Sequence, residues 1–145
     1  MITRQQIKDI AQKELQKHSC SAKIEFLNKK KFKKKALYSP IISQSLEEGN
    51  TLDELNIPAL ISRQTNAVYI SLETINHLLK DEPLSIQIRF IKSVILHEIF
   101  HLKERKEICT SDFNTALRLE ENTTKKFKKH YPGLAALGKR ICKSI

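Results

Sequence analysis

The sequence is poor in cysteine and lacks any long apolar run. Its 145 residues include three cysteines, an odd number without the spacing of a metal site. This count argues against a disulfide framework and favours a reducing compartment. No apolar run approaches the roughly 18 residues of a membrane span, and the first ten residues contain no apolar signal core. We therefore expect a cytoplasmic protein with no membrane partner.

Length and composition predict one folded domain. A chain of 145 residues can close one hydrophobic core but not two substantial ones. Apolar residues make up 40% of the chain and charged residues 29%, which is typical of a globular protein rather than a disordered one. No internal repeat or linker divides the chain, so we expect a single domain over residues 1–145.

Negative charge is scarce, because 26 Lys and Arg face 16 Asp and Glu, for a net charge of +10. Six lysines lie in the run Lys29–Lys35, around Phe32. The run can form a patch for phosphates or acidic protein, or a solvated strand edge or loop that its charge keeps from aggregating. We favour the second interpretation, because contacts with nucleic acid usually involve arginine as well and arginine is scarce here.

Apolar periodicity and turn signals predict a chain that mixes helices with a few short strands. Residues 22–27 alternate as a strand, and the apolar runs Ala59–Ser62 and Ala67–Ser71 flank a polar tetrapeptide, as in a β-hairpin. Residues 39–57 are polar and predict a loop with little regular structure. Helices are expected over residues 4–18, directly after Ser71, and over about 84–106, 112–130 and 134–145. The predicted fold class is α+β, with a small and mostly antiparallel sheet.

The helix that begins near residue 84 contains the motif His97-Glu98-Ile99-Phe100-His101. Apolar residues cover nearly its whole circumference, which predicts a helix buried through the centre of the domain. Two histidines four residues apart share one face, so both imidazoles can reach one Zn²⁺. Glu98 points about 100° away from His97, so it can take a proton from a water that such a zinc activates. Two hydrogen-bonded core histidines are the alternative interpretation.

A catalytic zinc site needs a third protein ligand, which the next helix can supply. With Phe113 at 0° on a helical wheel, Glu120 falls in the middle of the apolar face and Glu121 at its margin. A carboxylate on a buried face requires a cation, so Glu120 is the preferred ligand. Glu121 is the first alternative, and Asp112 or a water is the second.

This pattern of two histidines and a later glutamate resembles the gluzincin zinc metallopeptidases. The size and the order of elements are similar to the minimal gluzincins and to the ImmA/IrrE family of small cytosolic peptidases, over roughly residues 66–129. The resemblance implies a compact zincin-like domain in which His97, His101 and Glu120 bind zinc and Glu98 is the general base.

The resemblance also implies a substrate, namely a protein or peptide and often a regulatory protein such as a repressor. An extended substrate would add as a strand along Ala67–Ser71, the expected edge strand. Tyr69 on that strand is a candidate oxyanion donor, whereas Tyr131 lies about 16 Å along the helix from the glutamate and is out of reach. The chain departs from the family pattern at Thr123 and Thr124, where Ala and then Asp or Asn are usual.

Two other functions stay open. The chain can be a basic nucleic-acid-associated protein in which zinc is structural or absent, and a steep salt dependence of DNA or RNA binding would identify it. It can also be a catalytically silent peptidase fold that serves as a binding module. A zinc-loaded protein that cuts nothing in a mixed peptide library would favour this last interpretation.

Overall fold

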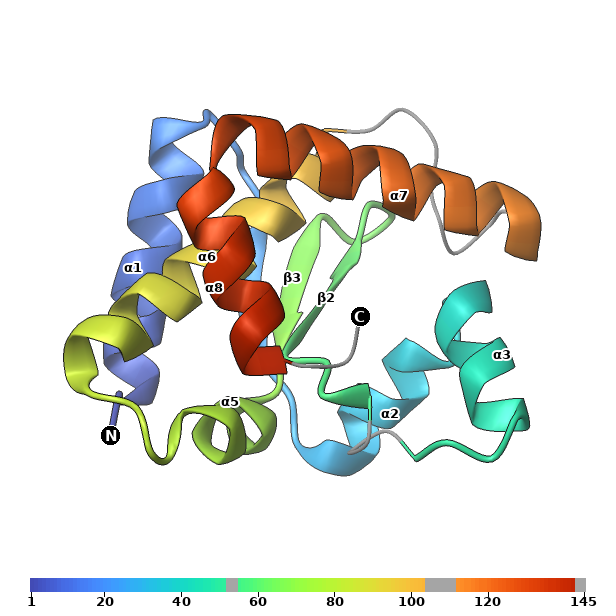
Figure 1. Cartoon of the computed structure of the whole chain (residues 1–145), viewed down its shortest axis with the longest axis horizontal. Coiled ribbons are helices and arrows are strands. Elements are labelled where there is room, and N and C mark those ends of the chain that lie inside the picture. The colour runs from blue at the N-terminus through green and yellow to red at the C-terminus, as the bar shows by residue number, and fades with distance from the viewer. Residues whose placement is uncertain (52–54, 104–111, 143–145) are drawn as a thin grey trace.

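The structure is a computed structural model that describes residues 1–51, 55–103 and 112–142. It has an α+β fold, as predicted, in which long helices surround a small sheet (Figure 1). The elements follow one another as α1 (Arg4–Lys17), β1 (Lys23–Phe26), α2 (Lys29–Ala36), α3 (Pro40–Glu47), β2 (Ala59–Ser62), β3 (Ala67–Ile70), α5 (Leu72–Leu79), α6 (Leu84–Leu102), α7 (Phe113–His130) and α8 (Pro132–Cys142).

The sheet has three strands in the order β1-β3-β2. Strands β2 and β3 form the predicted antiparallel hairpin, with Ala59 opposite Ile70. Strand β1 pairs with β3 in parallel, with Lys23 opposite Ala67, so the expectation of a mostly antiparallel sheet is wrong. The parallel pair arises because the chain passes through α2, α3 and β2 before it returns beside β1. Since β3 is the central strand, the expected edge position of Ala67–Ser71 is wrong as well.

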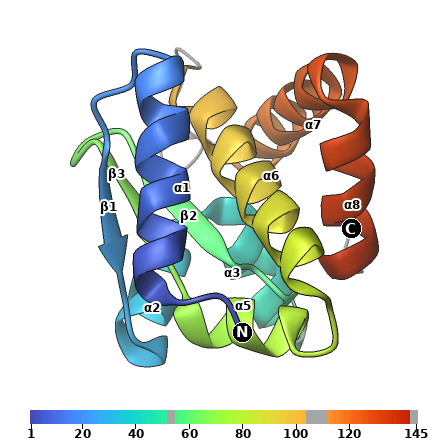
Figure 2. The same ribbon diagram turned by 90° about the vertical axis from the view of Figure 1, so that its left-hand side faces the viewer.

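The two faces of the sheet pack against different helices. Val68 and Ile70 of β3 belong to the main core, together with side chains of α1 and α6. Ala67 and Tyr69, which alternate with them, pack against Phe32 of α2 in a smaller cluster on the other face. Figure 2 shows α1 and α6 side by side in front of the sheet. Helix α2 therefore covers the face of the sheet that α6 does not.

Helix α6 is the central element of the core. It packs against α1, α7, α8 and β2, and its buried residues lie on several sides of the helix. This burial explains why its sequence shows no amphipathic stripe. The helix ends at Leu102, and the remainder of its predicted range, residues 104–106, lies outside the described residues. Within the described part of the chain, no helix has the length and apolar character that crossing a membrane requires.

Two helices occupy segments where none was expected. The lysine run forms α2, which Asn28 caps by accepting a hydrogen bond from the Lys31 backbone N–H. Phe32 and Ala36, one turn apart, are its buried residues, so the prediction of a strand edge or loop is wrong. Helix α3 lies inside the segment 39–57, where a loop was predicted, and has Pro40 in its first turn. Lysine is a good helix former and proline is tolerated at a helix start, which allows both helices.

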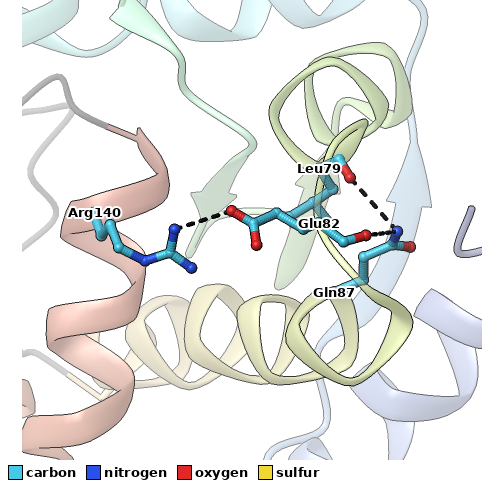
Figure 3. A network of polar contacts seen from close by, with 4 residues as sticks. All are labelled: Leu79, Glu82, Gln87 and Arg140. Carbon is cyan, nitrogen blue, oxygen red and sulfur yellow. Dashed lines mark hydrogen bonds and ion pairs between the residues drawn. The ribbon is translucent and has the colours of Figure 1, made fainter.

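A buried amide, that of Gln87, joins the N-terminal residues to the turn between α5 and α6, and Figure 3 shows its contacts with this turn. Gln87 is 4% exposed, and its side-chain oxygen accepts a hydrogen bond from the Ile2 backbone N–H at 2.7 Å. Its nitrogen donates to the carbonyls of Glu82 at 2.8 Å and Leu79 at 3.5 Å. The Glu82 carboxylate in turn accepts a hydrogen bond from Arg140 of α8 at 3.0 Å. The start of α6 is therefore tied to three other parts of the chain.

The substitution Gln87→Leu should lower the free energy of unfolding by about 1–3 kcal/mol. It keeps the side chain's approximate size but leaves a buried N–H and a buried carbonyl without their partner. The control is Gln12→Leu on the exposed side of α1, which should change stability by less than about 0.5 kcal/mol. Urea unfolding measures both, and equal stability of the two variants would show that the amide network contributes nothing.

Candidate metal centre

Two histidines near the end of α6 form one side of the site. His97 and His101 are one turn apart, and their rings stack with centroids 4.8 Å apart and planes 30° apart. The His101 side chain is 6% exposed and that of His97 is 28% exposed. The helix that carries them is buried along most of its length, so the site lies at the border between the core and the surface.

A carboxylate from α7 completes the group. The helix begins after Asp112, whose side chain accepts a hydrogen bond from the Thr115 backbone N–H, and its phase turns Glu120 toward α6. His101 Nε2 donates to one Glu120 oxygen at 3.0 Å, and His97 Nε2 lies 3.8 Å from the other. Glu121 is exposed on the helix surface. The geometry therefore agrees with the preference for Glu120 over Glu121. The role of Glu120 as a metal ligand stays a prediction.

The three side chains have the arrangement that a small metal ion requires. One ligand atom from each lies within 4.8 Å of the other two. Around tetrahedral zinc, donor atoms with bonds of 2.0–2.1 Å are about 3.4 Å apart, so modest side-chain rotations suffice to bind the ion. His97 Nε2 is buried and has no hydrogen-bond partner among the described residues. A buried imidazole nitrogen that faces a carboxylate at 3.8 Å without a hydrogen bond is one that a metal ion shared with the carboxylate would satisfy.

The protonation states also suit a metal. Burial, and then the charge of His101, lower the pKa of His97 to about 4, although the Glu120 carboxylate opposes them. Burial alone would raise the pKa of Glu120, but the hydrogen bond from His101 and the charges of both histidines hold it below its ordinary value. At neutral pH the group thus presents a neutral imidazole at His97 and an ionised carboxylate at Glu120, the forms that ligate divalent metals.

Glu98 lies directly beside this group without belonging to it. It follows His97 on α6 and is half-buried, about 100° around the helix from that histidine. Burial raises the pKa of Glu98 to about 7; the charge of His101 lowers it, and the Glu120 carboxylate raises it further. Glu98 is not among the three residues whose donor atoms converge, as the sequence predicted for a general base.

Phe127 is a site residue that the sequence analysis did not single out. Its ring stacks on the His97 ring with centroids 5.2 Å apart and planes within 4° of parallel. Phe100 meets Phe127 edge-on from the other side. Phe127 lies two turns after Glu120, on the same face of α7, and this spacing is the signal that could have identified it. The Phe127 ring fixes the orientation of the His97 imidazole, while the Glu120 carboxylate contacts the His101 imidazole.

The other predicted site residues lie elsewhere. Tyr69 is 3% exposed, packs on the α2 face of the sheet and shares a hydrogen bond with Thr65, so it is not an oxyanion donor for this group. Tyr131, the C-cap of α7, contacts Phe100 and Phe127, and it is not among the residues whose ligand atoms converge. Thr123 is fully buried and Thr124 is exposed.

Comparisons with known proteins identify no relative. No family model matches the chain, and no curated protein or solved structure matches it. The resemblance to gluzincins therefore depends on the residues of the motif and of Glu120, and it stays a prediction.

Purified protein should bind about one Zn²⁺ per chain, and Glu120→Gln should weaken that binding on the order of 100-fold or more. Changing a residue that only orients a ligand already weakens metal sites 10–100-fold, and the substitution removes the one anionic ligand. The control is Glu121→Gln, an equal change of charge one residue away, which should bind zinc as the wild type does. Competition with a chromophoric chelator gives the affinities. Equal zinc affinity in the two variants would contradict the assignment.

Replacing Phe127 with Leu should weaken zinc binding by about tenfold, because the ring that orients His97 is lost while the core keeps an apolar side chain. Phe100→Leu is the matched control, since Phe100 touches Phe127 but stacks on neither histidine. Both variants should lose similar stability in thermal unfolding, and only Phe127→Leu should lose zinc affinity. A loss of the same size in both would mean that general packing, rather than the stacked ring, supports the site.

Proposed function

We propose that this protein is a zinc-dependent metallopeptidase with a zincin-like domain, in which His97, His101 and Glu120 hold the metal and Glu98 is the general base. The observation that carries the proposal is the convergence of three ligand atoms from two helices around a buried imidazole nitrogen that has no hydrogen-bond partner among the described residues. Three protein ligands leave a fourth position of a tetrahedral ion open, which distinguishes catalytic zinc from structural zinc.

The chemistry divides between the ion and the chain. Zinc held by these residues would act as a Lewis acid that polarises the scissile carbonyl, and it would lower the pKa of water toward about 7. The Glu98 carboxylate takes the proton of the attacking water and delivers it to the leaving amine nitrogen. The Glu120 carboxylate and the two imidazoles keep the ion in place, and Phe127 keeps the His97 ring at its angle.

The sheet offers an extended substrate an edge strand that packs against the helix of the two histidines. Strand β2 (Ala59–Ser62) is one of the two edge strands and packs against α6, the helix of both histidines. A peptide that pairs with the outer edge of β2 would make main-chain hydrogen bonds with little dependence on its sequence. This role passes to β2 from the Ala67–Ser71 strand, whose two edges are both paired. A protein or peptide in an extended conformation is thus the proposed substrate.

The substitution Glu98→Gln tests the reaction. The amide keeps the shape of the carboxylate but cannot accept a proton, so the variant should fold and bind zinc while it loses on the order of 10²–10⁴-fold in hydrolysis. Zinc-loaded wild type, Glu98→Gln and Glu121→Gln should be incubated with a mixed peptide library, with and without a chelator, and the products read by mass spectrometry. Glu121→Gln should cut like the wild type.

Two results would contradict the proposal. Peptide bonds cut equally fast by wild type and Glu98→Gln would exclude Glu98 as the general base. A library left intact by zinc-loaded wild type, together with a host lysate left intact, would make the protein a metal-binding module without peptidase activity.

A further inference from the structure

Helix α2 concentrates positive charge more than any other element that the structure describes. Its eight residues include six lysines, all of them exposed, while its two other residues, Phe32 and Ala36, are buried. The helix covers one face of the sheet and lies at the edge of the molecule, well apart from α7 (Figure 1). Lys30, Lys31, Lys33 and Lys34 thus form an outward surface that the candidate metal centre does not use.

The electrostatics of α2 oppose its own folding. Lys29, Lys30 and Lys31 occupy its first turn, where the helix dipole favours anions, and no acidic residue lies there. Each of these lysines also has another lysine four residues later, and like charges at this spacing repel each other. Lys30, Lys31, Lys33 and Lys34 form no ion pair with any described residue, although the chain has 16 carboxylates. An anionic partner would relieve this repulsion.

Other basic clusters on the molecule have a local explanation that α2 lacks. Lys128 and Lys129 occupy the last turn of α7, where a cation offsets the negative end of the helix dipole. A pocket of about 340 Å³ contains His18, Lys103 and Tyr131, which are the C-cap residues of α1, α6 and α7. The basic residues that line this pocket, Lys103, Lys126 and His130, therefore lie at or near the C-termini of α6 and α7, where the helix dipole favours cations. In α2, by contrast, Lys30 and Lys31 lie in the first turn, at the positive end of the helix dipole, and no acidic residue accompanies them there.

The distribution of the charges indicates the shape of the partner. At 100° per residue Lys30, Lys31, Lys33 and Lys34 fan over roughly 160° of the helix circumference, with Lys30 and Lys34 near the centre and Lys33 and Lys31 on the two flanks. The other two lysines contact the protein itself, since Lys35 lies over the Tyr69 ring at 5.0 Å and Lys29 lines a pocket beside α5. A flat anionic surface, such as a membrane, would face mainly the centre of this fan. A groove with charged walls on two sides faces all of it. The major groove of B-form DNA is about 12 Å wide and admits an α-helix.

We propose that α2 docks in the major groove of duplex DNA and binds it without sequence preference. An eight-residue helix is about 12 Å long, so its flanking lysines reach phosphates on both walls of the groove. The outward surface has no Arg, Asn or Gln, the residues that read base edges, and lysine acts mainly as a point charge. The A-form major groove of duplex RNA is deep and narrow, so duplex RNA should bind more weakly.

Fluorescence anisotropy with a labelled mixed-sequence DNA duplex tests the proposal over a range of salt concentrations. The wild type should bind with an affinity that falls steeply with salt. A variant with Lys30→Gln, Lys31→Gln, Lys33→Gln and Lys34→Gln should bind at least tenfold more weakly at low salt, and its log–log salt slope should be smaller by about 3 to 4. Glutamine preserves helix propensity, and circular dichroism with thermal unfolding checks the fold.

The matched control removes the same charge elsewhere, through Lys125→Gln, Lys128→Gln, Lys129→Gln and Lys139→Gln on exposed positions of α7 and α8. It should retain most of the affinity and of the salt slope. If the fourfold α2 variant fails to fold, the milder pair Lys30→Gln and Lys34→Gln takes its place, with a slope smaller by about 2.

Three results would overturn the proposal. Equal losses in the α2 variant and the control would mean that net charge alone attracts DNA. Tighter binding to an RNA duplex would exclude a helix in a B-form groove. Binding to phosphatidylserine vesicles that depends on the α2 lysines, without comparable DNA binding, would make the surface a membrane contact instead.

Discussion

The burial of α6 is the constraint on which the rest of the structure depends. Phe90, Ile91, Ile95, Leu96 and Ile99 are each at most 2% exposed, and they face different neighbours around the helix. Each such side chain contributes roughly 1.5–3 kcal/mol when it leaves water, so the chain gains most by covering this helix on every side. Helices α1, α7 and α8 and strand β2 supply the cover. The positions of all four follow from the apolar character of one segment.

This same burial creates the candidate metal centre. His101 is 6% exposed because it extends the apolar helix toward its end, and a buried imidazole requires a polar partner. Helix α7 brings Glu120 to it at 3.0 Å, while Phe127 two turns later stacks on His97. Both contacts come from one face of α7, so its packing against α6 also assembles the donor group. The His97 nitrogen that the carboxylate does not reach has no hydrogen-bond partner among the described residues, and the proposed zinc would bind it.

Local patterns predicted the parts of the fold whose partners are near in the sequence. The β2–β3 hairpin needed a four-residue polar turn, and Ser71 at the start of α5 needed only its hydroxyl and the Thr74 backbone N–H. The position of Glu120 on the apolar face of α7, with Glu121 at its margin, could be predicted because each helical residue turns by a fixed 100° from the one before. The parallel pairing of β1 with β3 joins segments more than 40 residues apart, and no local signal encodes such a choice.

Other features depend on tertiary contacts and could not be predicted from the composition of their segments. The lysine run forms a helix that buries Phe32 against Ala67 and Tyr69 of the sheet and also buries Ala36, whereas its charge pattern alone suggested a strand edge or loop. The stacking of Phe127 on His97 depends on how closely α7 approaches α6, which spacing in the sequence does not determine. The identification of β2 as an edge strand likewise required the order of the strands in the sheet, which the sequence does not give.

X-ray absorption at the zinc edge tests the central claim most directly, because it reads the identity of the ligands without a substrate. The zinc-loaded protein should show about four nitrogen or oxygen neighbours at roughly 2.0–2.1 Å, with the outer-shell scattering of two imidazoles and no sulfur near 2.3 Å. The spectrum of a protein carrying His97→Ala should lose about half of the imidazole scattering. A sulfur shell, or a shell of oxygens without imidazole scattering, would contradict a site made of His97, His101 and Glu120.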